Sequence, residues 1–225
     1  MDLTTTVEQL FDQALAHKET YNAFSDRDIR TSFFTNMINQ CATVHINLII
    51  NKRYLEGGSE ESRSLFADDQ DRVYLYMENL MQNSVELIVE AALFQSELVF
   101  RTLNASLTGH DIYDGSSIPR LIANLYDDTE NNWTKEECKL FVLLSSIRNT
   151  IHTGGVYFKN TAGETKVFKG NNYTFIYGKP PAYPAGIGIL DLVSELFDAM
   201  KVLFDSAKIA AIGQLEHPNY NALGK

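Results

Sequence analysis

The sequence predicts a mainly α-helical protein, a bundle of four or five main helices with a small β-hairpin inserted before the last helix. Three observations lead to this fold class. Apolar residues recur at steps of three and four over most of the 225-residue chain. Alternation with a period of two is confined to residues 156–178. Helical spacing then returns at 189–212. Because the helical segments share one pattern, we treat residues 1–225 as a single domain.

The composition is that of a folded globular protein, with 44% hydrophobic and 21% charged residues. A net charge of −10 argues against a broad electrostatic grip on nucleic acid, although a local basic site remains compatible with it. The N-terminal stretch MDLTTTVEQLFDQ has no apolar segment of the secretory type. The longest apolar runs are too short to span a bilayer. We therefore expect a cytoplasmic protein with no membrane partner.

The first half of the chain predicts two helices, a loop and a long third helix. Residues 4–17 and 28–54 have helical periodicity, and Asp26 is the expected N-cap of the second helix. Residues 56–72 are rich in Gly, Ser and acidic residues, which predicts a mobile loop. The third helix, at 73–103, is apolar on most sides and should lie centrally in the bundle. Its main apolar face is expected to contain Leu80, Ser84, Leu87, Ala91, Phe94 and Leu98.

The next helices are shorter. We expect a loop at 104–116 and a short helix at 117–128. Thr134 followed by Glu137 forms a capping box that would begin the next helix. The two glycines at 154–155 would end that helix in the left-handed conformation.

Residues 156–178 then change period. The stretches VYFKN, ETKVFKG and NYTFIYG alternate and are separated by Gly and Asn, which predicts a β-hairpin or a small three-stranded sheet. We expect the alternating aromatic residues Tyr173, Phe175 and Tyr177 to pack on the helices rather than stack on bases. A last helix is predicted at 189–212.

Common cofactor and metal motifs are absent from the sequence. There is no P-loop, no GxGxxG after a strand, no HExxH, no paired CxxC, no EF-hand loop and no GxSxG. None of the five histidines pairs with another at ligand spacing. We therefore expect neither a cofactor nor a metal site.

Residues 146–155, SIRNTIHTGG, form the most distinctive polar motif. In a helix, Arg148 and His152 lie about 40° apart around the axis and therefore share a face. Asn149 lies beside that face, and the two glycines place the motif in the last turn.

An apolar helix that ends in R-N-x-x-H-x-x-G resembles the signature helix of the HEPN superfamily. The preceding long helix, VELIVEAALFQSELVFRTL, is similar to the central HEPN helix, so the resemblance covers about residues 73–212. A hairpin and a closing helix after the motif are also found in some HEPN-like groups. Three residues separate Arg148 from His152 here, whereas active members usually have four to six. The shorter spacing should keep His152 on the helix.

The resemblance implies a helical bundle that forms a homodimer, with two copies of the motif facing each other across a groove. In active members this groove cleaves RNA without a metal ion, often in a toxin or an antiviral effector, so an antitoxin or another protein partner is also implied. By this resemblance His152 would be the general acid or base, Arg148 would stabilise the charge that develops on the phosphate, and Asn149 would orient the phosphate or the histidine. The residue types suit these roles, because histidine titrates near neutrality and arginine offers a fork to phosphate oxygens.

Three alternatives remain open. Cations in the last turn of a helix interact favourably with its dipole and its last carbonyls, which accounts for Arg148 and His152 without any activity. HEPN-like proteins also include non-catalytic modules that bind a protein or a nucleotide, and a structural subunit without a ligand is the third alternative. The ribonuclease hypothesis requires Arg148 and His152 to face solvent in a groove. It loses its basis if Arg148 is buried against Glu97 while His152 bonds only to helix carbonyls.

Two further sets of residues have a structural and a functional interpretation. Glu97 and Arg101 are four residues apart, as in a surface ion pair, but they could also support a groove around Arg148. Lysines along the expected hairpin could contact RNA phosphates, or they could protect an edge strand from pairing with another chain. These are Lys159, Lys166 and Lys169.

Overall fold

The computed structural model describes residues 2–56, 69–109, 111–112, 115–128, 135–184 and 188–218. The chain is mainly α-helical with a two-stranded hairpin before the last helices, as the sequence predicts. The helices and strands are α1 (Leu3–Glu19), α2 (Ile29–Glu56), α4 (Gln70–Thr108), α5 (Ile118–Asp128), α6 (Lys135–Ile151), β1 (Glu164–Phe168), β2 (Asn171–Phe175), α7 (Ile189–Phe204) and α8 (Ala207–Ala210).

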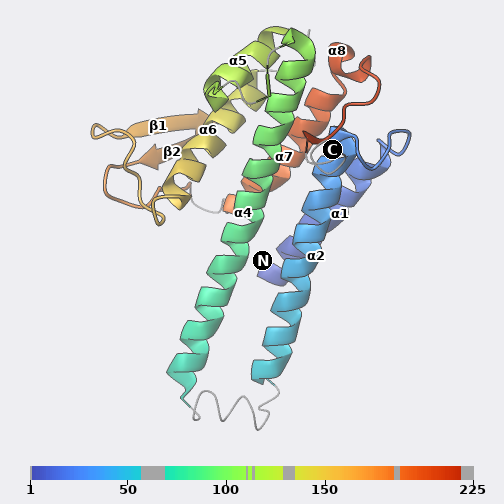
Figure 1. Ribbon diagram of the computed structural model, residues 1–225. Coiled ribbons are helices and arrows are strands. Elements are labelled where there is room, and N and C mark those ends of the chain that lie inside the picture. Colours follow the sequence, from blue (N-terminus) through green and yellow to red (C-terminus); the bar gives the residue numbers. More distant parts are fainter. Residues whose placement is uncertain are drawn as a thin grey trace.

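Helices α2 and α4 form a long antiparallel pair (Figure 1). Their ends nearest residues 56 and 69 project beyond the other helices, whereas their opposite halves lie in the bundle with α1 and α7. Helices α5 and α6 lie together on one side of α4, and the β-hairpin lies beyond α6. Aromatic rings of α2 and α7 pack edge to face in the core, among them Phe33, Phe34, Phe197 and Phe204.

Helix α4 is buried on one side only, which corrects the predicted apolar face. Ile88, Ala92 and Val99 are fully buried. Leu87 and Phe94 were expected on the buried face, yet their exposed fractions are 51% and 57%. The apolar pattern of α4 is too wide to identify the buried side, because residues on both sides are hydrophobic. The side of α4 that includes Leu87 and Phe94 faces solvent in the single chain.

Helix α4 is also longer than predicted at both ends. The carboxylate of Asp69 accepts hydrogen bonds from the amides of Asp71 and Arg72, so the helix begins three residues early. Gly109, with φ 72°, supplies the left-handed residue that ends it, so residues 104–108 are helical and not part of a loop. Of the loop expected at 56–72, residues 57–68 lie outside the described residues.

The N-cap of α2 is Asp28 and not Asp26. The Asp28 carboxylate accepts a hydrogen bond of 3.0 Å from the amide of Arg30 and pairs with the Arg30 guanidinium at 2.7 Å. Both side chains are fully buried. Arg30 also donates to the carbonyl of Ile209 at 3.2 Å, which ties the segment after α7 to the start of α2.

The predicted last helix is two helices. Ser206, with ψ 137°, leaves the helical conformation and precedes α8. The Asp205 carboxylate accepts a hydrogen bond of 2.9 Å from the hydroxyl of Tyr21, which holds the break against the turn that follows α1. Serine favours helix N-termini, so Ser206 favours a new helix start over continuation of α7. The apolar spacing of 189–212 does not indicate this break.

The β-element is a two-stranded antiparallel hairpin, in which Glu164 is opposite Phe175 and Phe168 is opposite Asn171. Residues 156–160, the first of the three predicted strands, are not a strand. Tyr173 and Phe175 are buried as predicted, with exposed fractions of 2% and 1%. Tyr177 is 45% exposed, so the prediction that it packs on the helices is wrong.

Within the described ranges, no helix is both long and apolar enough to cross a membrane.

Candidate functional site

The end of α6 places Arg148 and His152 on consecutive helical turns. The His152 amide donates to the Arg148 carbonyl at 3.1 Å, so His152 continues the helical hydrogen-bond pattern. The chain then turns at Gly154 and Gly155, which have φ of 71° and 81°, and the Gly155 amide donates to the Thr150 carbonyl at 2.8 Å. This is a left-handed helix terminus, as predicted from the two glycines. The predicted capping residue at the other end, Thr134, lies outside the described residues.

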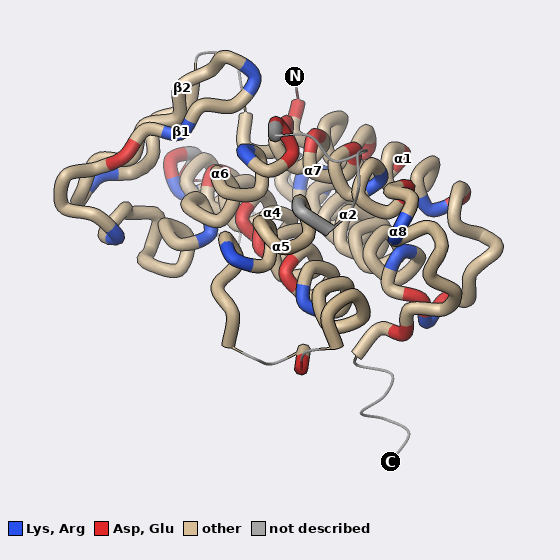
Figure 2. The backbone as a smooth tube through the Cα atoms, turned by 90° about the horizontal axis from the view of Figure 1, so that it is seen from above, with Lys and Arg blue, Asp and Glu red and all other residues tan. Residues whose placement is uncertain are grey.

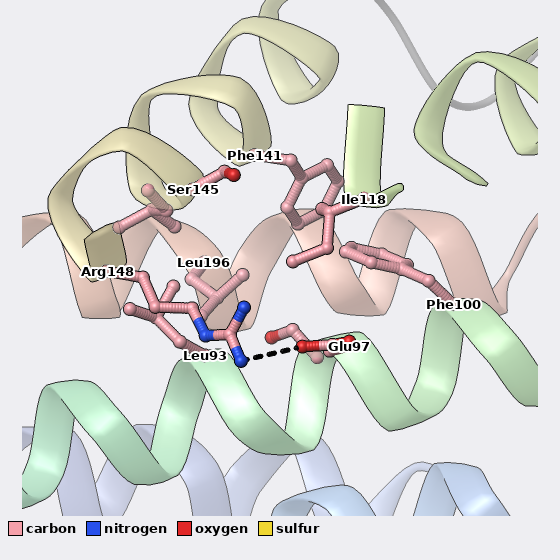
Figure 3. Close-up of a pocket in the computed structure, with 10 residues that line it drawn as sticks. Leu93, Glu97, Phe100, Ile118, Phe141, Ser145, Arg148 and Leu196 are labelled. Atoms are coloured by element: carbon pink, nitrogen blue, oxygen red, sulfur yellow. Dashed lines mark ion pairs between the residues drawn. The ribbon is translucent and has the colours of Figure 1, made fainter. Parts of the chain in front are cut away.

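Arg148 lies where α6 packs against α4. One of its terminal nitrogens, Nη2, is 3.2 Å from Oε2 of Glu97, and its side chain is 32% exposed (Figure 3). Both side chains border a small cavity of about 20 Å³, enough for one water molecule. Apolar side chains from α4, α5, α6 and α7 complete the wall, among them Leu93, Phe100, Ile118, Phe141 and Leu196.

Glu97 is shared by two arginines. Arg101 donates from Nε and Nη2 to Oε1 of Glu97, at 3.0 and 2.8 Å, while Arg148 binds the other oxygen. Arg101 also donates to the Ser116 carbonyl at 3.2 Å. The ion pair expected between Glu97 and Arg101 is therefore present, and it is joined to Arg148. One carboxylate facing two guanidinium groups leaves this ion-pair cluster of Glu97, Arg101 and Arg148 with one excess positive charge.

His152 and Asn149 lie outside the ion-pair cluster. The His152 side chain is exposed, and its ring has no hydrogen bond or ion pair to any described residue. Asn149 is half-buried, and its carbonyl accepts a bond of 3.0 Å from the Thr153 hydroxyl. The structure thus brings three of the five predicted site residues into contact and leaves the other two beside them.

The sequence allows two extreme arrangements: Arg148 and His152 both face solvent in a groove, or Arg148 is buried against Glu97 while His152 bonds only to helix carbonyls. The structure matches neither of them. Arg148 is paired with Glu97, yet about a third of its side chain stays accessible. His152 is accessible and does not bond to helix carbonyls through its ring, as far as the described part of the chain shows. A cation that only stabilises the helix end would be expected at the last carbonyls, whereas the Arg148 guanidinium points to a neighbouring helix (Figure 3).

The hairpin is fastened to α6 through Glu164. Its carboxylate accepts a bond of 3.0 Å from the hydroxyl of buried Ser146 and pairs with Lys166 at 2.9 Å. Burial, and then the neighbouring Glu164 carboxylate, raise the pKa of Tyr157 to about 12. Burial alone would raise the pKa of Glu164, but the contacts with Lys166 and Ser146 help to lower it overall. The hairpin is thus tied to the same helix that carries Arg148.

Two of the three hairpin lysines are occupied by carboxylates. Lys166 pairs with Glu164, and Lys169 pairs with Glu195 on α7 at 2.6 Å. Lys159 is exposed, and no ion pair to it occurs among the residues with described positions. These contacts favour structural roles for Lys166 and Lys169.

Three features of this region were missed by sequence reasoning. Leu87 and Phe94 are exposed apolar side chains on α4, the helix that carries Glu97, and the Ser116 carbonyl accepts a bond from Arg101. The missed signal for the exposed pair is their seven-residue spacing, which continues to Arg101. Ser116 precedes α5 by two residues, and no local pattern indicates its contact with α4.

In the described part of the chain, no group of three or more His, Cys, Asp or Glu side chains is arranged to hold a metal ion. No family model matches the chain, and no curated protein or solved structure matches it either. The resemblance to the HEPN superfamily therefore stays a prediction from the residues of the motif and its neighbouring helix.

Proposed function

We propose that this protein is a HEPN-like endoribonuclease that acts as a homodimer, with Arg148 and His152 in the groove between two copies. The observation that supports this most is the exposed His152 ring, which is one helical turn from an arginine held at the rim of a cavity. Both side chains project from a helix end that two left-handed glycines fix. A rigid support of this kind is what positioned acid–base catalysis requires.

The proposed reaction needs only the side chains of His152, Arg148 and Asn149 to transfer its protons and stabilise its charge. A neutral imidazole accepts the proton of a ribose 2′-hydroxyl, and the 2′-oxygen forms a bond to phosphorus while the bond from phosphorus to the 5′-oxygen breaks. The partner's His152, protonated, donates a proton to the leaving 5′-oxygen. Arg148 stabilises the negative charge on the non-bridging oxygens, and Asn149 orients the phosphate or the imidazole. The products are a 2′,3′-cyclic phosphate and a 5′-hydroxyl.

The exposed side of α4 supports the homodimer. Leu87 and Phe94 are seven residues apart, and Arg101 follows seven residues later on the same stripe. Glu97 lies at the edge of this stripe and Arg148 lies against it. A second copy that covered Leu87 and Phe94 would bury two large apolar side chains and bring the two ion-pair clusters towards each other. We call this surface the α4 stripe: Leu87, Phe94 and Arg101.

A second function, a non-catalytic module that binds a protein or a nucleotide, is favoured by one specific contact. Glu97 already occupies the Arg148 guanidinium, and a phosphate would have to displace this carboxylate or bind the remaining donors. If the ion pair is permanent, Arg148 fastens α6 to α4 and the α4 stripe alone serves as a binding surface.

RNA cleavage in the presence of EDTA separates these two functions. We expect the wild type to cut single-stranded RNA, and we expect both Arg148→Ala and His152→Ala to lose this activity while they remain folded. Lys139→Ala is a matched control, because Lys139 is on the same helix but pairs with Glu136 near its start. Growth arrest on expression of the wild type, absent with His152→Ala, would add a role as a toxin. Unimpaired cutting by His152→Ala would reject the proposed chemistry.

A further inference from the structure

Two exposed aromatic rings lie side by side near the hairpin. Phe158 and Tyr177 are 51% and 45% exposed, and their ring centroids are 5.4 Å apart at 84°. Each exposed ring follows a buried one closely along the chain: Phe158 comes directly after Tyr157, and Tyr177 comes two residues after Phe175. Large aromatic side chains held at a surface offer flat faces on which unpaired bases can stack.

Two lysines are close neighbours of the two rings along the chain. Lys159 follows Phe158 directly, and Lys179 is two residues after Tyr177; both are exposed. Neither has an ion pair to another described residue, in contrast to Lys166 and Lys169. We call Phe158, Lys159, Tyr177 and Lys179 the aromatic–lysine surface.

The charge of this region is opposite to that of the whole protein. Residues 156–184 contain four lysines and one glutamate, whereas the chain carries a net charge of −10. The hairpin side of the molecule accordingly shows mainly Lys and Arg among its charged residues (Figure 2). Because Lys166 is paired with Glu164 and Lys169 with Glu195, Lys159 and Lys179 supply the local excess of positive charge that attracts phosphates.

The backbone holds the two rings in place. The Tyr157 amide donates to the Lys179 carbonyl at 3.0 Å, and the Gly178 amide donates to the Tyr157 carbonyl at 2.8 Å. Tyr157 is fully buried and anchors this pair of segments to the core. The aromatic–lysine surface is therefore preorganised, which reduces the entropy lost on binding.

A depression of about 540 Å³ lies next to Tyr177. It is lined by residues 161–165 and 174–177, with the hydroxyls of Thr165 and Thr174 from the two strands. These residues combine an aromatic ring with hydrogen-bonding hydroxyl groups, as a nucleobase and its sugar require, and the one carboxylate among them, Glu164, is paired with Lys166.

From these features we propose that the aromatic–lysine surface binds single-stranded RNA by base stacking and phosphate contacts. Phe158 is six residues after His152, so the two lie at most about 20 Å apart along the chain. The surface would therefore hold the strand whose phosphate reaches His152; this delivery step rests on the proposed ribonuclease function, whereas the binding itself does not. A protein partner matches this surface less well than RNA does. The phosphates of an RNA strand complement the unpaired lysines, and its bases complement the half-exposed rings.

The test measures binding separately from cleavage. Fluorescence anisotropy of a labelled 12-nucleotide poly-U RNA is recorded with the His152→Ala protein, in which the proposed cleavage is absent. Adding Phe158→Ala and Tyr177→Ala should weaken binding at least about fivefold, as expected for the loss of base stacking. Adding Lys159→Ala and Lys179→Ala should lower the slope of log K against log salt concentration by about 1.4, since single strands lose about 0.7 per phosphate contact.

Matched controls come from the projecting end of the α2–α4 pair. Tyr74→Ala removes an aromatic side chain that is 70% exposed, and Lys52→Ala removes an exposed lysine; both should leave binding unchanged. Poly-dT of the same length distinguishes RNA from DNA, and equal affinity for it would overturn the assignment to RNA. No binding at low salt, or equal affinity of the Phe158→Ala and Tyr177→Ala protein, would overturn the proposal even if the wild type cuts RNA. Binding by this surface without any cleavage would instead support it and reject the ribonuclease function.

Discussion

At the scale of single residues, Glu97 determines how Arg148 is presented. It accepts bonds from Arg101 on its own helix and from Arg148 on α6. The spacing of four residues predicts the first contact, because those positions are neighbours on any helix. The second joins residues 51 positions apart and depends on how α6 packs on α4, which no local pattern specifies. Sequence reasoning could therefore identify the participants but not their geometry.

Replacing Glu97 by Gln should lower the free energy of unfolding by about 1–2 kcal/mol, because two partly buried guanidinium groups lose their shared carboxylate. Urea denaturation measures this change. Glu78→Gln is the control on an exposed part of α4 and should change stability by less than about 0.5 kcal/mol. Equal stabilities of the two variants would show that the ion-pair cluster does not hold α6 to α4.

His217 should make the protein less stable in mild acid. It is 3% exposed, and burial lowers its pKa in the folded state below the ordinary value. The unfolded chain therefore binds more protons than the folded chain once the pH falls through about 6.5, so acidification favours unfolding. Thermal unfolding between pH 7.5 and 5.5 should show a smaller decrease in Tm for His217→Gln than for the wild type. The same decrease in both proteins would assign the pH dependence to other groups.

At the scale of elements, the sequence predicts some helix ends and not others. The two adjacent glycines after α6 predict the end of that helix, because they follow a strong apolar pattern. Gly109 does not stand out as the end of α4, because the mostly polar residues 104–108 look like a loop before the helix ends. Ser206 does not stand out as the break after α7, because the apolar spacing continues past it. The hairpin was found by its period of two, but Phe158 and Tyr177 show that alternation does not decide which face is covered.

Gly155→Ala should destabilise the protein by about 1–2 kcal/mol, because φ of 81° strains any residue with a Cβ. An added Cβ would meet no atom within 4 Å, so steric contact contributes nothing to this effect. Gly213→Ala is the matched control, since its added Cβ also lies in open space and its φ is not positive. Differential scanning calorimetry should show a lower Tm for Gly155→Ala only. Equal Tm values would mean that the end of α6 adjusts without cost.

At the scale of the whole molecule, the exposed side of α4 is the feature that a single chain leaves unexplained. The sequence predicts a central α4, and α4 is central to the bundle, but α2, α5, α6 and α7 cover only part of it. Leu87 and Phe94 remain exposed on the helix that carries Glu97 and Arg101 of the ion-pair cluster. Apolar spacing indicates that a helix face is hydrophobic. It does not indicate whether that face packs against the same chain or against another copy.

Leu87→Glu combined with Phe94→Glu should convert a homodimer into a monomer, because two carboxylates would be buried in the interface without partners. Sedimentation velocity should give a mass of twice 25.4 kDa for the wild type and of a single chain for the variant. Leu15→Glu on α1 is the control, because Leu15 is 39% exposed. This variant should have the same mass in solution as the wild type. A monomeric wild type would contradict a groove made from two copies.

The most direct measurement of the central claim is the chemistry of the RNA ends that this protein produces in EDTA. The proposed mechanism predicts a 2′,3′-cyclic phosphate and a 5′-hydroxyl, no cutting where the attacking 2′-hydroxyl is replaced by hydrogen, and no product from His152→Ala. Intact RNA after incubation with the folded wild-type dimer would contradict the claim. So would cutting that persists at a 2′-deoxy position, because the proposed reaction begins at that hydroxyl.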